Sequence, residues 1–253
     1  MQTLKIEMIH DVVCSWCHIG HQNISRALER VSNEVSAEVH YLPFQLNPDM
    51  GPLGVDIAKY LWQRNQWSIA EVMAYRKNLM EKTKEVGVTI DFSKRTRYYN
   101  TANAHRLILA AENLGLQRQI HQALLQAYHV EGENISDIDV LVKTAEKIGF
   151  DKNRVSQAIG STVINQQLKA LEERVRLYSV KSVPAFIFNG SRFVSGSHSA
   201  DYFEQLIRSE FLHKELNKEP NKEPDKRLGK EPDKELNEEL INAQTKENDP
   251  CPM

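Results

Sequence analysis

The chain has 253 residues and carries 32 Lys and Arg against 34 Asp and Glu, so its net charge is −2. This balance excludes a nucleic-acid-binding protein that works by bulk positive charge. The 3 cysteines exclude a secreted domain stapled by disulfides. No run approaches the roughly 18 apolar residues of a membrane span, and no export signal is visible at the N-terminus, so we expect a cytoplasmic protein.

The C-terminal residues 213–253 differ in composition from the rest of the chain. They hold 8 basic and 11 acidic residues and 5 of the 9 prolines, but no Phe, Tyr or Trp. The tripeptide Lys-Glu-Pro recurs there at 218–220, 222–224 and 230–232. Because such a segment cannot bury enough apolar surface to offset its chain entropy, we predict a disordered, charged, low-complexity tail.

The body of the chain opens with a strand, a helix and a second strand. Apolar and charged residues alternate over residues 4–8, which is typical of a strand with one buried face. An apolar stripe at helical spacing follows over residues 17–31. Residues 37–42 form another strand candidate, which Pro43 ends.

The middle of the body is helical, and its end returns to strands. Apolar stripes predict about five or six helices between residues 57 and 178, one of them beginning at a capping-box pattern over 68–71. Residues 183–188 then predict a buried strand, which an Asn-Gly turn joins to a partner at 192–195. A last helix is expected at 200–212.

Two cysteines, Cys14 and Cys17, stand between the first strand and the first helix. A helix N-terminus carries unpaired N–H groups and the positive end of the helix dipole. A thiolate at Cys14 would lie in this field, so its pKa should fall. Cys17 is one turn further along nearly the same face and could attack a mixed disulfide at Cys14. The pair therefore predicts thiol–disulfide chemistry, with Cys14 as nucleophile and Cys17 as resolving thiol.

Three other interpretations of the pair remain open. The five residues from Cys14 to His18 match the C-x-x-C-H pattern of haem attachment, although that pattern normally serves exported proteins. Cys14, Cys17, His18 and His21 supply four potential zinc ligands, but on one straight helix they cannot surround a tetrahedral ion, so we expect no metal site. Finally, the two cysteines could be ordinary small core residues at a helix start.

The Cys segment and several later segments resemble the FrnE-like branch of the DsbA family. The matching segments occur in the same order as in that branch and lie at 11–20 (DVVCSWCHIG), 43–48 (PFQLNP), 100–107, 182–186 (SVPAF) and 194–196 (VSG). The resemblance covers about residues 3–212 and leaves out the tail. This family is related to 2-hydroxychromene-2-carboxylate isomerases and kappa-class glutathione transferases.

The resemblance implies an α/β protein with a thioredoxin fold and a large all-helical insertion. We accordingly expect a thioredoxin-like domain from residues 1–56 and 179–212, an inserted helical domain over 57–178, and the low-complexity tail over 213–253. It also implies that Val183-Pro184 is a cis peptide that faces the Cys pair. Backbone groups of Val183 could then pair with an extended polypeptide or with glutathione.

This chain departs from the family pattern at the Cys motif. Ser15-Trp16 stands where the family more often has Pro-Trp, and His18 replaces a Tyr found in many relatives. His18 could add positive charge beside the cysteines, or it could point into solvent or onto the helix flank. Without a cationic residue between the cysteines, we expect a weaker oxidant than a periplasmic DsbA.

Other polar residues have both a functional and a structural interpretation. His105 could line the substrate cleft or be a buried histidine near a helix start, and Asp11 could accept a proton from Cys17 or cap the helix. Asn100 is expected to be a helix N-cap. Phe44 could border the cleft, and Cys251 could form a disulfide with Cys14 or have no role. The residues that we expect to contact substrate are Ser15, Trp16, Phe44, His105, Val183 and Pro184.

The sequence thus predicts a cytoplasmic protein-disulfide oxidoreductase of the DsbA superfamily. Protein disulfides or glutathione mixed disulfides would be its substrates, and the glutathione or thioredoxin pool would exchange electrons with it. We expect no tightly bound cofactor, no nucleic acid and no membrane partner, and a homodimer is compatible with the sequence. One alternative is a glutathione-dependent isomerase or transferase acting on a small aromatic molecule, for which Ser15 would stabilise the glutathione thiolate. A binding module that recruits partners through its tail is another.

Overall fold

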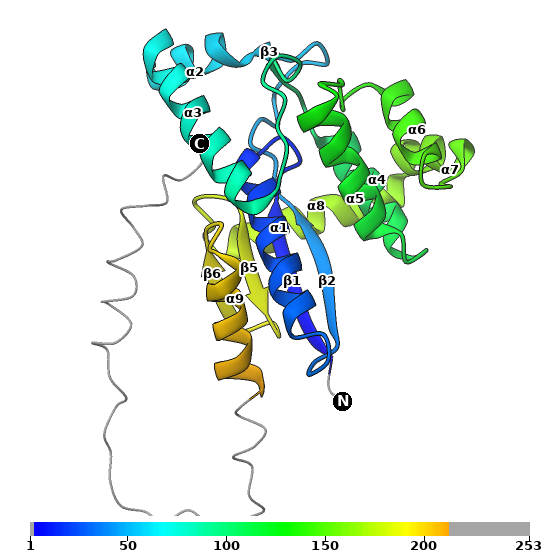
Figure 1. Ribbon diagram of the computed structural model, residues 1–253. Helices are drawn as coiled ribbons and strands as arrows, with labels where there is room; N and C mark the ends of the chain where they lie inside the picture. Colours follow the sequence, from blue (N-terminus) through cyan, green and yellow to red (C-terminus); the bar gives the residue numbers. More distant parts are fainter. Residues whose placement is uncertain (1–2, 213–253) are drawn as a thin grey trace, which may run out of the picture.

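The computed structural model describes residues 3–212, and its centre is a four-stranded sheet (Figure 1). The strands are β1 (Leu4–His10), β2 (Ala37–Pro43), β5 (Ala185–Phe188) and β6 (Arg192–Ser195), in the spatial order β2-β1-β5-β6. β1 pairs parallel with β2, whereas β5 runs antiparallel to both β1 and β6. This is the α/β thioredoxin arrangement that the resemblance implies.

Two helices from the two ends of the described chain pack side by side on the sheet. α1 (Ser15–Arg30) connects β1 to β2 and lies next to α9 (Ala200–Ile207) (Figure 1). The expected final helix over 200–212 is therefore only partly right, because a π-helical turn, η2 (Arg208–Leu212), replaces its last turn. Under α9, the ring of Phe203 meets the ring of Phe186 edge-on at 4.8 Å, so the core lies between this helix pair and β5.

Seven α-helices lie between β2 and β5, a stretch that the structure describes throughout, so the expected number of five or six was too low. The additional ones are α2 (Ile57–Asn65) and α7 (Lys152–Gly160), which are nine residues long and bury only two residues each. The others are α3 (Ile69–Val86), α4 (Ala102–Glu112), α5 (Gln117–Leu125), α6 (Ile138–Glu146) and α8 (Thr162–Leu177). A short strand pair, β3 (Val55–Asp56) and β4 (Arg97–Tyr98), links the connection before α2 to the connection between α3 and α4.

Local signals in the sequence explain several helix ends. The capping box before α3 is confirmed: Glu71 N–H donates to Ser68 Oγ at 3.3 Å, and Ser68 N–H donates to Glu71 Oε2 at 2.7 Å. The expected cap at Asn100 was wrong by one residue, because Thr101 is the N-cap of α4. Asn100 instead accepts from Ala102 N–H and donates to Pro48 O, which ties the start of α4 to the loop after β2.

Helix α5 continues into a π-helical turn, η1 (Gln126–Val130). Such turns often change the direction of side chains near functional sites. The buried residues of η1 include Tyr128, which donates to Arg97 O in β4, and His129, which bonds to Val12 O in the turn after β1. The stretch between β2 and β5, called the helical segment below, therefore makes a polar contact with the rest of the body through His129.

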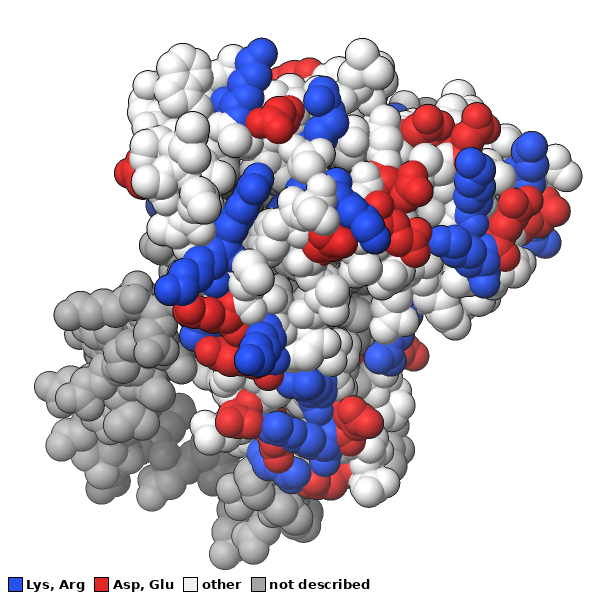
Figure 2. Space-filling model, turned by 45° about the horizontal axis from the view of Figure 1, so that its top comes forward, with Lys and Arg blue, Asp and Glu red and all other residues white. Residues whose placement is uncertain are grey.

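The surface of the body carries a mixture of charges. Figure 2 shows basic and acidic side chains interspersed over the visible face. Within residues 3–212, no helix is long and apolar enough to cross a membrane. The predicted tail and Cys251 lie outside the described residues.

Candidate active site

The first cysteine of the pair stands at the very start of α1. Cys14 is the N-cap residue, with extended backbone angles (φ −80°, ψ 118°), and its Sγ accepts a hydrogen bond from Cys17 N–H at 3.4 Å. Asp11 was one candidate for this cap, but the capping atom is the sulfur of Cys14. The helix begins at Ser15, two residues before the apolar stripe that predicted it. An N-cap sulfur lies where the orphan N–H groups of a helix converge.

The second side of the site comes from the loop before β5. The Val183–Pro184 peptide is cis, as the resemblance implies. Cys14 Sγ lies 3.7 Å from the carbonyl oxygen of Val183, so the two segments meet at the sulfur although they are 169 residues apart. Pro184 O accepts from Gly196 N–H at 2.8 Å, which fixes this loop against the residue that follows β6.

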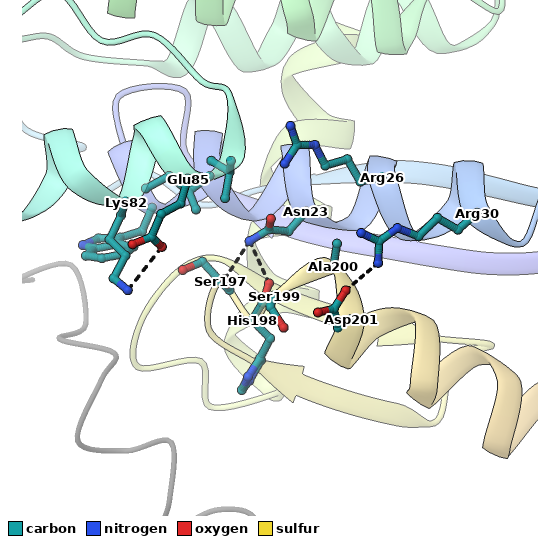
Figure 3. Close-up of a pocket in the computed structure, with 13 residues that line it drawn as sticks. Asn23, Arg26, Arg30, Lys82, Glu85, Ser197, His198, Ser199, Ala200 and Asp201 are labelled. Atoms are coloured by element: carbon teal, nitrogen blue, oxygen red, sulfur yellow. Dashed lines mark hydrogen bonds and ion pairs between the residues drawn. The ribbon is translucent and has the colours of Figure 1, made fainter.

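The two residues between the cysteines are buried. Ser15 and Trp16 are 2% and 4% exposed, and the indole Nε1 of Trp16 has no hydrogen-bond partner within residues 3–212. Trp16 lines one end of a hollow of about 350 Å³. Figure 3 shows this hollow between α1, α3 and the loop before α9, with Asn23 bonded to the carbonyls of Ser197 and His198 at its base.

The other two expected contact residues do not touch the sulfur of Cys14 in any contact that we find within residues 3–212. His105 is buried in α4, where its Nε2 stands 3.7 Å from Asp11 Oδ1, beyond hydrogen-bond distance. The other carboxylate oxygen of Asp11 accepts from Leu46 N–H at 2.7 Å. Phe44 is half-buried, and it lines a second hollow of about 420 Å³ against the end of α8. The structure thus brings Cys14, Cys17 and Val183 together, and places His105 beside Asp11 and Phe44 beside α8.

A cluster of buried histidines fills the space between β1, α1 and α5. His10 and His121 are fully buried, with ring centroids 4.6 Å apart, and His121 stacks on Tyr41 at 4.1 Å. His21 bonds through Nε2 to Tyr41 Oη at 2.9 Å. Burial lowers the pKa of His21 to about 3 and the pKa values of His10 and His121 well below 6.5. These imidazoles are therefore neutral near pH 7.

Among the residues that the structure describes, no group of three or more His, Cys, Asp or Glu side chains could hold a metal ion.

His18, directly after Cys17, is neutral as well. Its ring lies 4.9 Å from that of His129, and the side chain is mostly buried instead of pointing into solvent. Burial, and then the positive charge of Arg95, lowers the pKa of His18 to about 4. His18 therefore does not add positive charge beside the cysteines at neutral pH.

The buried cation near the site is a residue that sequence reasoning missed. Arg95 is 3% exposed and donates from Nη2 to Val13 O at 3.1 Å, and His129 Nε2 bonds to Val12 O at 2.9 Å. Both side chains come from the helical segment and contact the turn just before Cys14. Arg95 follows Ser93-Lys94 in a polar stretch that reads as solvent-exposed, so no local signal marks it.

The match to a family model decides the affiliation of the chain. Residues 5–208 match the model described as DSBA-like thioredoxin domain. The chain belongs to the DSBA-like thioredoxin domain family. This affiliation agrees with the four-stranded sheet and with the Cys pair at the start of α1.

Several known proteins are similar to the folded body over most of its length. The uncharacterized protein YwbO of Bacillus subtilis is 27% identical over 213 residues, which cover 82% of this chain and 98% of YwbO. The crystal structure of a probable DsbA oxidoreductase from Streptomyces coelicolor has a TM-score of 0.76 at 21% identity and covers 89% of this chain and 95% of its own. The cytosolic disulfide reductase DsbM from Pseudomonas aeruginosa, solved with GSH, has a TM-score of 0.57 at 16% identity and covers 84% and 98%.

Proposed function

We propose that this protein is a thiol–disulfide oxidoreductase whose redox-active pair is Cys14 and Cys17. The observation that carries the proposal is the place of the Cys14 sulfur, which accepts from Cys17 N–H at the α1 N-terminus and lies 3.7 Å from Val183 O. A helix N-terminus favours the thiolate over the thiol, and the thiolate is the attacking species. An adjacent backbone segment gives an extended substrate groups to pair with.

The reaction follows from this arrangement in two exchanges. The Cys14 thiolate attacks one sulfur of a substrate disulfide, forms a mixed disulfide and releases the other substrate sulfur as a thiolate. Cys17 then loses its proton and attacks Cys14 Sγ, which forms the Cys14–Cys17 disulfide and releases the second substrate thiol. Two electrons pass from the pair to the substrate, and the same steps run in reverse when the pair acts as an oxidant.

We further propose that the protein works in the cytoplasm with the glutathione or thioredoxin pool and without a tightly bound cofactor. Protein disulfides and glutathione mixed disulfides are the substrates that fit the exchange. The hollow lined by Trp16, the residue between the two cysteines, has room for a small thiol compound. The cytosolic disulfide reductase DsbM, whose structure was solved with GSH, supports glutathione as a co-substrate.

The test is equilibration in glutathione buffers of graded redox potential, followed by alkylation of thiols and intact-mass measurement. The proposal expects a reversible two-electron transition that is lost in Cys14→Ser and kept in Cys251→Ser. Cys17→Ser should accumulate a mixed disulfide at Cys14, because the resolving thiol is absent. A pair that never forms a reversible disulfide would refute the oxidoreductase. Tight retention of glutathione without a disulfide would instead favour a glutathione-dependent isomerase or transferase.

A further inference from the structure

The turn that precedes the nucleophile is held by side chains of the helical segment. Arg95 Nη2 donates to Val13 O at 3.1 Å, and His129 Nε2 bonds to Val12 O at 2.9 Å. The residues involved are all buried. Buried main-chain carbonyls need donors, so these two side chains satisfy groups at the end of β1 that the sheet leaves unpaired. Of the two, only Arg95 carries a charge at neutral pH, because burial lowers the pKa of His129 well below 6.5.

Arg95 is a buried cation without a carboxylate beside it. Its guanidinium lies over the rings of Tyr98 and Tyr128, at 5.5 and 5.1 Å from their centroids. No Asp or Glu oxygen lies within 4.0 Å of it anywhere in residues 3–212, and its Nε has no hydrogen-bond partner there. Burial raises the pKa of Tyr128, so this phenol stays neutral and does not balance the charge. A buried charge without a counter-ion is costly, and such groups gather at functional sites.

The charge of Arg95 acts on the Cys motif itself. Its bond to Val13 O places Nη2 within about 6 Å of the Cys14 backbone nitrogen, because the carbonyl and that nitrogen belong to one peptide group. On the other side of the motif, Arg95 is one of the two causes that lower the pKa of His18. The opposing group nearby is Asp11, whose Oδ1 accepts from Val13 N–H at 3.4 Å and lies 3.7 Å from His105 Nε2, and whose Oδ2 accepts from Leu46 N–H. In a buried setting such charges are poorly screened by salt.

We propose that Arg95 is a positioning residue whose buried charge stabilises the Cys14 thiolate and thereby makes the Cys14–Cys17 pair a stronger oxidant. The inference rests on the proposed function of the pair. Reduction of the disulfide takes two electrons and one proton and yields a Cys14 thiolate and a Cys17 thiol. A fixed positive charge near Cys14 favours these products, so it shifts the equilibrium toward the reduced pair.

The experiment compares three variants of the full chain in glutathione buffers. Arg95→Gln removes the charge but keeps an N–H that can donate to Val13 O, and Arg95→Lys is the conservative variant, with an amine that can carry the charge. His129→Leu removes the neutral bond to Val12 O and leaves the charge unchanged. The measured quantities are the equilibrium constant for oxidation of glutathione by the pair and the pH profile of Cys14 alkylation. Circular dichroism establishes that each variant is folded.

We expect Arg95→Gln to lower the equilibrium constant about tenfold, which corresponds to about 30 mV for two electrons, and to shift the alkylation profile to higher pH. Arg95→Lys should fall between Arg95→Gln and the parent protein, because a buried lysine loses its proton more readily than an arginine. An unchanged equilibrium in Arg95→Gln, an equal shift in His129→Leu, or a larger shift in Arg95→Lys than in Arg95→Gln would each overturn the role of the charge. If Arg95→Gln does not fold, Arg95→Met takes its place with the same expected result. In all these cases the reversible disulfide persists, so the proposed function would stand.

Discussion

Gly20 provides the sharpest test of how α1 packs against the loop before β5. A Cβ added at this position would lie 2.8 Å from Cγ and 3.5 Å from Cβ of Pro184, and 3.4 Å from Cζ of Phe186. Carbon atoms are in contact at about 3.5–4.0 Å, so the proline ring must move by several tenths of an ångström. The ring cannot rotate away as a flexible side chain would, because Pro184 leads directly into β5.

We expect Gly20→Ala to destabilise the protein although alanine is the better helix former. Overpacking costs about 1–3 kcal/mol, and the gain in helix propensity offsets about 0.5–1 kcal/mol of it. At the middle of these ranges the net loss is about 1 kcal/mol, which should lower the melting temperature by about 2–4 °C for a body of this size. The carbonyl of Val183, which Cys14 Sγ contacts at 3.7 Å, would move with the proline, so disulfide exchange should also become slower.

The assays are thermal unfolding followed by circular dichroism and reduction of a protein disulfide at saturating thiol. Gly160→Ala is the matched control, because Gly160 ends α7 and a Cβ there meets nothing within 4 Å. It should leave activity unchanged and raise the melting temperature slightly. If Gly20→Ala were as stable and as active as Gly160→Ala, the close packing of α1 on Pro184 would be refuted.

Further predictions concern pH, a helix cap and a loop contact. Burial lowers the pKa of His18 to about 4 and of His21 to about 3 from 6.5, so below pH 6.5 the unfolded chain binds protons that the folded chain does not. The free energy of unfolding should therefore fall by about 1.4 kcal/mol per pH unit for each histidine between pH 6.5 and about 4, and equal urea midpoints at pH 7 and 5 would contradict this. Ser68→Ala should cost about 1 kcal/mol in urea unfolding, and Ser68→Thr should restore most of it, because only the first removes the cap of α3. Asn23→Ala leaves the carbonyls of Ser197 and His198 without their donor and should lower stability by about 1–3 kcal/mol, with faster amide exchange in the loop before α9.

The parts of the fold that could be predicted from the sequence are those with local signals. Alternation over β1, the Asn-Gly turn between β5 and β6, and the capping box at Ser68 each depend on residues that are close in the chain. The place of Cys14 at the start of α1 belongs to this class too. The position of Val183 across from Cys14 does not belong to this class. It depends on the pairing of β5 with β1, which no local signal reveals, and we inferred it from the resemblance to a known family.

The polar interior could not be predicted, because its members come from separate elements. His10 lies on β1, His21 on α1 and His121 on α5, so no spacing in the sequence reveals that they share one cluster. A histidine at the end of a strand is ordinarily assigned to the surface. The burial of Arg95 is even harder to predict from the sequence, because its neighbours in the chain are polar and the ring of Tyr128 that covers it is distant in the chain.

The helical segment between β2 and β5 is therefore part of the candidate site and more than a cover over it. It supplies Arg95 and His129, the donors to the carbonyls of Val12 and Val13, and the peptide group of Val13 continues into Cys14. Any movement of this segment against the sheet would leave two buried carbonyls without donors and would also withdraw the positive charge that we propose acts on the nucleophile. Such a movement is strongly opposed. A four-stranded sheet with a Cys pair alone would keep the helix N-terminus and the Val183 carbonyl but would lose Arg95. On our proposal, part of the redox strength of the pair therefore comes from outside the thioredoxin core.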